Sequence, residues 1–161
     1  MKRYIRTTIT PISNEPIDVQ LEILRNGSSP DILWEFANST PALQADLAKN
    51  PNAPQELLRE LYNHNLPKVN ISLSNNPNTP SDILTELSGS RDERIRENVA
   101  KNQNTPVEVL LRLTDDYSTY VRLKLLRNPV HNIEVINRLS EDSNFEIKRA
   151  AKTLLLQLKH H

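Results

Sequence analysis

Apolar side chains recur along the chain with the spacing of short amphipathic helices. Apolar residues follow Pro30, Pro54, Pro80, Pro106 and Asn132 at the third, fourth and seventh positions, which places them on one face of a helix. We call these predicted elements the B helices. Their apolar columns are Leu33/Trp34/Ala37, Leu57/Leu58/Leu61, Ile83/Leu84/Leu87, Val109/Leu110/Leu113 and Val135/Ile136/Leu139.

A second apolar stripe lies seven and three positions before a recurring Asn, and it predicts the A helices. Its columns are Val19/Ile23, Leu43/Leu47, Val69/Leu73, Ile95/Val99, Val121/Leu125 and Ile147/Ala151. Asn tolerates the left-handed conformation that closes a helix, and a following Pro prevents its continuation. We therefore expect each A helix to end at the Asn.

The short segment between an A helix and a B helix predicts the start of the B helix. Thr79 and Thr105 are suited to the N-cap, with Pro80 and Pro106 at the first helical position. His131 takes the corresponding cap position in a later repeat. The predicted structural joints are Asn50, Asn76, Asn102, Asn128, Pro54, Pro80 and Pro106.

The period of this pattern predicts a repeat architecture. The Asn residues at 26, 50, 76, 102 and 128 are separated by 24, 26, 26 and 26 positions. Self-similarity at such a period is typical of solenoids, so we expect an all-α solenoid of about five helical hairpins of 24–26 residues. Residues 17–158 form the predicted single repeat domain, residues 1–16 an arm or cap, and residues 159–161 a disordered tail or tag remnant.

Four segments carry a resemblance to a known family. They are "IRENVAKNQNTPVEVLLRL" from Ile95, "VRLKLLRNPVHNIEVINRL" from Val121 and the weaker copies "VNISLSNNPNTPSDILTEL" and "LQADLAKNPNAPQELLREL". The repeat resembles that of the leucine-rich repeat variant (LRV) family, a relative of the HEAT-like helical repeats, over about residues 17–158. The resemblance implies a right-handed superhelix used as a binding or scaffold surface. The period here is mostly 26, where the family is nearer 24, and a chain without Cys cannot form the iron–sulfur segment of some members.

Composition narrows the class of protein. Twenty basic residues balance twenty acidic ones, and neither half of the chain has the basic excess of a dedicated nucleic-acid binder. The absence of Cys excludes disulfides and fits a reducing compartment. The longest apolar run, Leu154–Leu156, is far shorter than the roughly 20 residues of a membrane span. We expect a cytoplasmic protein without a membrane partner.

No catalytic arrangement emerges from the sequence. His64 and His131 fall at a predicted turn and a predicted cap, and there is no Gly-rich phosphate loop or nucleophile motif. Two carboxylate pairs follow B helices 26 positions apart, as repeated turn residues do: Asp115/Asp116 and Glu141/Asp142. We expect no enzyme activity, no cofactor and no metal site.

One polar column is the candidate binding stripe. It directly follows the first apolar position of each A helix and reads Gln20, Gln44, Asn70, Arg96, Arg122 and Lys148. Arg112 and Arg138 recur 26 positions apart on the B helices and join the candidate set. The alternative is that these arginines form internal ladders with acidic residues, including Asp115, Asp116 and Asp142. Tyr117 and Tyr120 flank the same turn and supply either ligand contacts or packing beneath it.

The last repeat departs from the pattern. Leu154 stands where the period predicts Asn, and the helix continues through "KTLLLQL". This segment is either an ordinary last core helix or an apolar surface, with Leu154, Leu155 and Leu158, for self-association or a following domain.

These patterns predict a non-catalytic scaffold that binds an unidentified protein through the polar and basic stripe. The alternative is a nucleic-acid-binding HEAT-like solenoid that uses Arg96, Arg122 and Lys148. A third hypothesis is an enzyme-like pocket on the concave face of the solenoid.

Overall fold

The computed structural model describes residues 15–25 and 30–159, and this part of the chain is all-α. It contains eleven helices and no strand. The A helices are α1 (Ile17–Arg25), α3 (Pro41–Lys49), α5 (Pro67–Asn75), α7 (Glu93–Lys101), α9 (Thr119–Leu125) and α11 (Phe145–Leu158). The B helices are α2 (Pro30–Glu35), α4 (Gln55–Asn63), α6 (Ser81–Leu87), α8 (Val107–Leu113) and α10 (Ile133–Leu139). Most of the predicted arm, residues 1–16, and the last two residues lie outside the described ranges.

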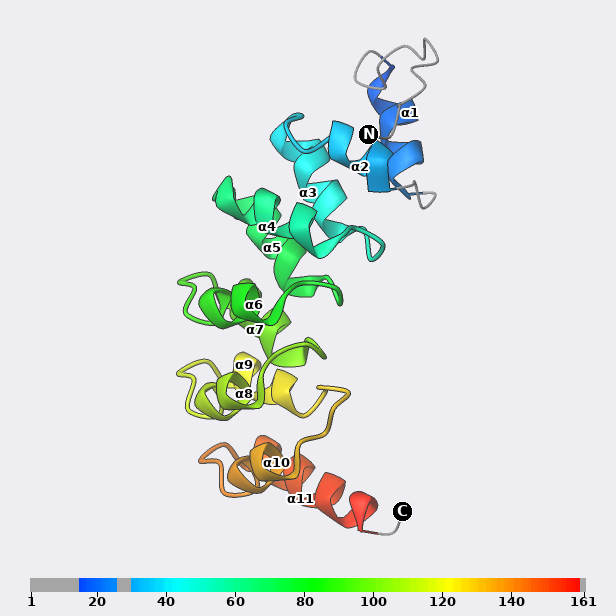
Figure 1. Ribbon diagram of the computed structural model, residues 1–161. Helices are drawn as coiled ribbons and strands as arrows, with labels where there is room; N and C mark the ends of the chain where they lie inside the picture. The colour runs from blue at the N-terminus through cyan, green and yellow to red at the C-terminus, as the bar shows by residue number, and fades with distance from the viewer. Residues whose placement is uncertain (1–14, 26–29, 160–161) are drawn as a thin grey trace.

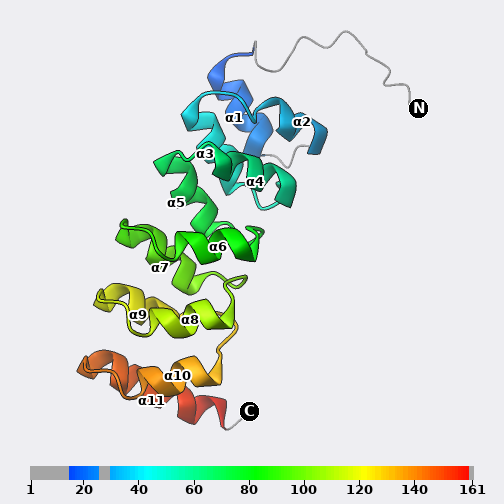
Figure 2. The ribbon, with the colours of Figure 1, turned by 60° about the vertical axis from the view of Figure 1, so that its left-hand side comes forward.

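The helices are stacked in pairs along one axis, with α1 and α2 at one end and α11 at the other (Figures 1 and 2). α3 packs on α5, α5 on α7 and α7 on α9. The turns that lead from A to B helices lie along one side of the stack, and those from B to A helices along the other (Figure 1). We call the first side the A–B edge, residues 49–54, 75–80, 101–106 and 127–132. The second is the B–A edge, residues 64–66, 88–92, 114–118 and 140–144.

Most of the predicted apolar columns form the core, with exceptions at α1, where Val19 is half-buried, and at α2. The side chains of the other four B columns are buried, as are those of the five A columns from Leu43/Leu47 onward. Trp34 was expected in the core, but 42% of its surface is exposed, and Phe36 is buried in its place. α2 ends at Glu35, so the turn that follows it directs Phe36 inward. The side chain of Ile23 lies outside the described residues.

The predicted role of the threonines before the B helices is wrong. The Thr79 hydroxyl donates to the Leu73 carbonyl oxygen at 2.7 Å, and that of Thr105 donates to Val99 at 2.6 Å. Each threonine thus satisfies a carbonyl near the end of the A helix instead of capping the B helix. Proline occupies the N-cap itself, with extended ψ values of 143° to 147°, so the preceding threonine lies too far back to cap. These N-cap prolines are Pro54, Pro80 and Pro106.

The predicted left-handed end of the A helices is also wrong. Asn50, Asn76 and Asn102 have φ between −67° and −77° and extended ψ. Among the described non-glycine residues, φ is positive at Asn65 and at His131. Because His131 has this turn conformation, Asn132 caps α10 in its place, with its side chain accepting from the backbone of Glu134 and Val135.

The extended Asn residues instead join consecutive repeats. The Asn76 side-chain nitrogen Nδ2 donates to the carbonyl oxygens of Ala48 at 2.8 Å and Asn50 at 2.9 Å, both in the preceding repeat. Its Oδ1 accepts from the backbone N–H of Asn78 at 2.8 Å. The corresponding contacts recur at Asn102 and Asn128. We call Asn76, Asn102 and Asn128 the Asn ladder.

The last helix departs from this scheme. Leu154 occupies the next ladder position, and α11 packs mainly against α10 instead of α9. Leu154, Leu155 and Leu158 are half-buried against the core, while Leu156 is 60% exposed. None of the helices in the described ranges combines the length and apolar character needed to cross a membrane.

Candidate functional site

The candidate stripe lies between the repeats and is largely covered. Gln20, Gln44 and Arg96 are buried, with Arg96 only 4% exposed, and the rest of the column is half-buried. Because each member follows the first core residue of its A helix, the helix directs it toward the neighbouring B–A turn. The column therefore offers few free donors to a ligand.

Both arginines of the column form bidentate ion pairs with the next repeat. Arg96 donates from Nε and Nη2 to the Asp116 carboxylate at 2.8 and 3.2 Å. Arg122 donates in the same way to Asp142 at 2.8 and 3.1 Å. Each aspartate lies 20 residues after its arginine. Such two-bond geometry is the strong form of a carboxylate–guanidinium contact.

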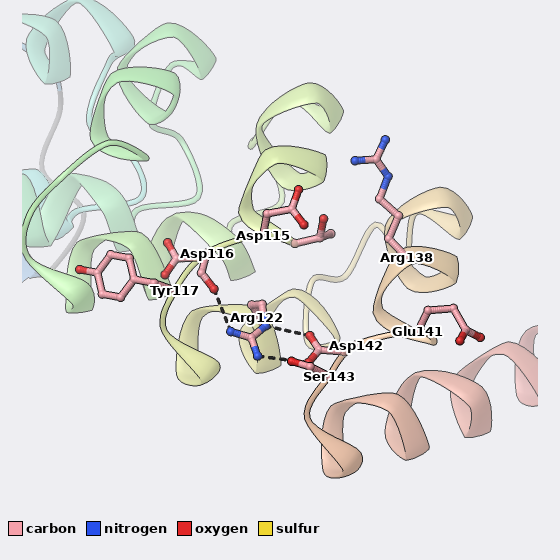
Figure 3. A pocket seen from close by; sticks show the side chains of 9 residues that line it. Asp115, Asp116, Tyr117, Arg122, Arg138, Glu141, Asp142 and Ser143 are labelled. Atoms are coloured by element: carbon pink, nitrogen blue, oxygen red, sulfur yellow. Dashed lines mark hydrogen bonds and ion pairs between the residues drawn. The ribbon is translucent and has the colours of Figure 1, made fainter.

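The third guanidinium nitrogen of each arginine also donates within the protein. Nη1 of Arg96 donates to the Ser90 carbonyl oxygen at 2.8 Å, and Nη1 of Arg122 to that of Asp116 at 2.8 Å. Figure 3 shows Arg122 lying between Asp116 and Asp142. This arrangement corresponds to the internal ladder that the sequence left open as an alternative to a binding stripe.

The aspartates also organise the start of the next A helix. Asp116 Oδ1 accepts from the backbone N–H of Ser118 at 2.8 Å, and Asp142 Oδ1 from that of Asn144 at 2.7 Å. Burial by itself raises the pKa of Asp142, but the bonds from Arg122 and Asn144 outweigh it and hold that pKa below its ordinary value. The ion pairs therefore fix both the stacking of the repeats and the entry into each helix.

An amide side chain makes the same kind of contact in one earlier repeat. Gln44 donates from Nε2 to the Ser39 carbonyl oxygen at 2.9 Å, and its Oε1 lies 3.1 Å from His64 Nδ1, again 20 residues on. We call Gln44–His64, Arg96–Asp116 and Arg122–Asp142 the inter-repeat pairs. Asn70 breaks the series, because its Oδ1 is buried without a partner.

The other predicted site residues are not part of this set. The Arg112 guanidinium donates to the Ser88 hydroxyl at 2.5 Å. Arg138 is half-exposed and lies 3.7 Å from Glu134. Lys148 is half-buried near Asp142, where its charge helps to lower the Asp142 pKa. The structure thus brings Arg138 to the same pocket as Arg122, whereas Arg112 and Arg96 do not line it.

A groove of about 710 Å³ opens on the B–A edge beside Arg122 (Figure 3). It is bounded by the α8–α9 turn, the α10–α11 turn and Arg138 of α10. Asp116 and Asp142 within it are already bound to guanidinium groups. Asp115 and Glu141 are exposed at its margin. The groove offers shape and negative charge to a ligand.

One exposed aromatic side chain, Tyr117, lines this groove. Tyr117 is 79% exposed, and the Arg96 guanidinium lies 4.4 Å from the centre of its ring. Tyr120 and Phe145 are 66% and 71% exposed, so the tyrosines do not pack beneath the turn. Sequence reasoning missed Phe145, although its position directly before the carboxylate of Glu146 and outside both apolar stripes marks it as a surface residue.

Within residues 15–25 and 30–159, no group of three or more His, Cys, Asp or Glu side chains is placed to hold a metal ion. A scan against protein-family models finds no match, and neither the search of curated proteins nor that of solved structures finds a similar protein.

Proposed function

We propose that the chain is a non-catalytic protein-binding scaffold, built as a right-handed α-solenoid of about five hairpins like those of the LRV and HEAT-like families. The observation that carries the proposal is the internal use of the polar groups. The arginines that resemble a ligand stripe bind Asp116 and Asp142 instead, and so hold the repeats together. A repeat stack joined in this way offers a long, ordered surface for a partner.

The exposed aromatic side chains at the B–A edge and in the first turns of the A helices that follow it are the best-supported contact surface for that partner. Tyr117 lines the groove, and Tyr120 and Phe145 are exposed in the first turns of α9 and α11. Tyr and Phe are enriched at protein interfaces, where a rigid ring buries a large area at a low cost in conformational entropy. The polar stripe contributes indirectly, because it fixes the spacing of these turns.

Nucleic-acid binding through Arg96, Arg122 and Lys148 is disfavoured by the same geometry. A phosphate would have to displace a bidentate carboxylate from each arginine. We therefore expect no binding of duplex or single-stranded nucleic acid through this stripe at low salt, where the phosphate contribution is largest.

The proposal is tested by cross-linked pull-down from a lysate with the wild-type chain, the Y120A/F145A variant and an L156A control. Leu156 is an exposed apolar residue on α11, outside the B–A edge. We expect the wild-type chain and L156A to retain the same proteins and Y120A/F145A to lose them. Retention of no protein above the bare matrix would overturn the scaffold function, and equal retention by Y120A/F145A would overturn the assigned surface.

A further inference from the structure

The two edges of the stack carry opposite charges, although the chain as a whole is neutral. The A–B edge contains Lys49, Lys101 and Arg127 and not one Asp or Glu. The opposite B–A edge contains a single Lys or Arg, which is Arg91. Its acidic residues are Asp92, Asp115, Asp116, Glu141 and Asp142. Figure 1 shows the two sets of turns on opposite sides. The chain therefore has a basic edge although its overall charge is balanced.

The cations of the A–B edge form a column at the repeat spacing. Each directly precedes an Asn at a predicted joint, and Asn75 takes the remaining position. Lys49 is bound to Asp46 at 2.7 Å. Among the described residues, Lys101 and Arg127, in adjacent layers, have no side-chain ion pair or hydrogen bond. A cation at or just beyond the end of a helix is favoured by the helix dipole. Arg127 is exposed and Lys101 is half-buried.

The edge also carries amide side chains and a hollow between layers. A cavity of about 200 Å³ is lined by Lys101 together with Asn75, Asn98 and Gln103. Amide groups donate and accept hydrogen bonds, which suits a peptide backbone. The ammonium group of Lys101 suits a carboxylate beside that backbone.

We propose that the A–B edge binds an extended, acidic segment of a partner protein, with carboxylates facing Lys101 and Arg127. This inference rests on the scaffold function proposed above and assigns the chemistry of a partner. Packed helical layers are about 10 Å apart. A polyproline II segment has three residues per turn and a rise of about 3.1 Å per residue, so every third side chain faces the same way at about 9 Å. Acidic residues at every third position of such a peptide would therefore be spaced like the helical layers of the protein, with one carboxylate facing each repeat.

A peptide fits this edge better than a nucleic acid does. Strong binding to nucleic acid requires Lys or Arg contacts to several phosphates, and Lys101 and Arg127 are the two unpaired cations among the described residues of the edge. Single-strand binding also relies on aromatic rings that stack on bases, and residues 49–54, 75–80, 101–106 and 127–132 contain no aromatic residue.

The test is fluorescence anisotropy at low salt with the full chain and a proline-rich peptide that has Glu at every third position. A peptide of the same composition with its Glu residues clustered is the spacing control. We expect K101E/R127E to weaken binding at least tenfold. The matched variant R91E/R94E makes the same change in charge near the opposite edge and is expected to bind as the wild-type chain does. Circular dichroism shows whether each variant is folded. If K101E/R127E does not fold, the charge-neutralising variant K101Q/R127Q is used in its place.

Each outcome decides the proposal. Selective binding of the spaced peptide, lost in K101E/R127E and kept in R91E/R94E, supports it. Absence of binding, equal binding of the clustered peptide or equal loss in both variants overturns it. Tighter binding of a single-stranded oligonucleotide that depends on Lys101 and Arg127 assigns the edge to nucleic acid and overturns it as well. The scaffold function is tested separately, because its pull-down depends on Tyr120 and Phe145.

Discussion

At the scale of single residues, side-chain amides and carboxylates decide how the repeats are joined. The Asn ladder reaches back to carbonyl oxygens 26 and 28 residues earlier, and Arg96 and Arg122 reach forward 20 residues. Because these groups are buried, removal of one hydrogen-bonding partner leaves the remaining group unsatisfied, since water cannot reach it. Small changes in these side chains should therefore have large effects.

The first prediction concerns Asn102. N102A removes the donors to Ser74 and Asn76 and the acceptor for the Asn104 N–H, and we expect a loss of about 2–4 kcal/mol in the free energy of unfolding. Urea unfolding followed by circular dichroism measures it. The control is N52A at an exposed Asn of another joint, expected within about 0.5 kcal/mol of the wild-type chain. Similar stability of the two variants would contradict a joining role for the ladder.

The second prediction concerns pH. The pKa of Asp142 in the folded chain lies below its ordinary value of 3.8. Its carboxylate therefore stabilises the fold above that value, and this contribution disappears as the pH falls through the lowered pKa. We expect D142N to be less stable than the wild-type chain at pH 7 and the difference to shrink below about pH 4. Urea unfolding over a pH series checks this, and a difference that stays constant down to about pH 2 would contradict it.

At the scale of helices, much of the fold follows from the sequence and the details of the helix ends do not. The apolar stripes identify the A and B helices because spacings of three, four and seven are local properties of one chain segment. The sequence favours Thr79 as a helix cap, but the extended backbone of Pro80 at the N-cap leaves the Thr79 hydroxyl to donate to the Leu73 carbonyl oxygen. The sequence pattern also mispredicts Trp34. Because α2 ends at Glu35, the ring of Phe36 is buried and that of Trp34 is exposed.

The third prediction concerns the interrupted column at α5. Asn70 Oδ1 is buried without a partner, whereas the longer Gln44 reaches both Ser39 and His64. We expect N70Q to raise the free energy of unfolding by about 1 kcal/mol, since the longer side chain reaches the preceding turn. The reciprocal variant Q44N shortens the side chain that makes both contacts and is expected to lose about 1 kcal/mol. Thermal and urea unfolding measure both; destabilisation by N70Q would show that the site lacks room for the longer chain.

At the scale of the whole molecule, each layer depends mainly on its neighbours. The A helices pack in sequence from α3 to α9, while α11 packs mainly on α10, without an Asn of the ladder. The Arg122–Asp142 pair thus joins the last hairpin to the stack. In a repeat array of this kind, unfolding that starts in one layer is expected to remain confined to that layer and its neighbours.

The fourth prediction follows from this arrangement. D142N should accelerate amide hydrogen exchange in α10 and α11 and leave α3 and α5 unchanged, because the broken contact lies at one end of the stack. Hydrogen exchange read by mass spectrometry at neutral pH tests this. As a control, R138Q removes a half-exposed guanidinium and is expected to leave exchange unchanged throughout. A uniform rise along the chain in D142N would show that the molecule opens as a single unit.

The sequence by itself determined the helices, their apolar faces and the polar column, because each is repeated at a short spacing along the chain. It did not determine the partners of that column. Asp115 and Asp116 are adjacent and chemically alike, yet only Asp116 is bound to Arg96. The direction of each side chain depends on the backbone of the turn and on the stacking of the next repeat. Only the tertiary structure could therefore decide that the basic residues which resemble a binding stripe are internal, and that unpaired cations lie on the A–B edge.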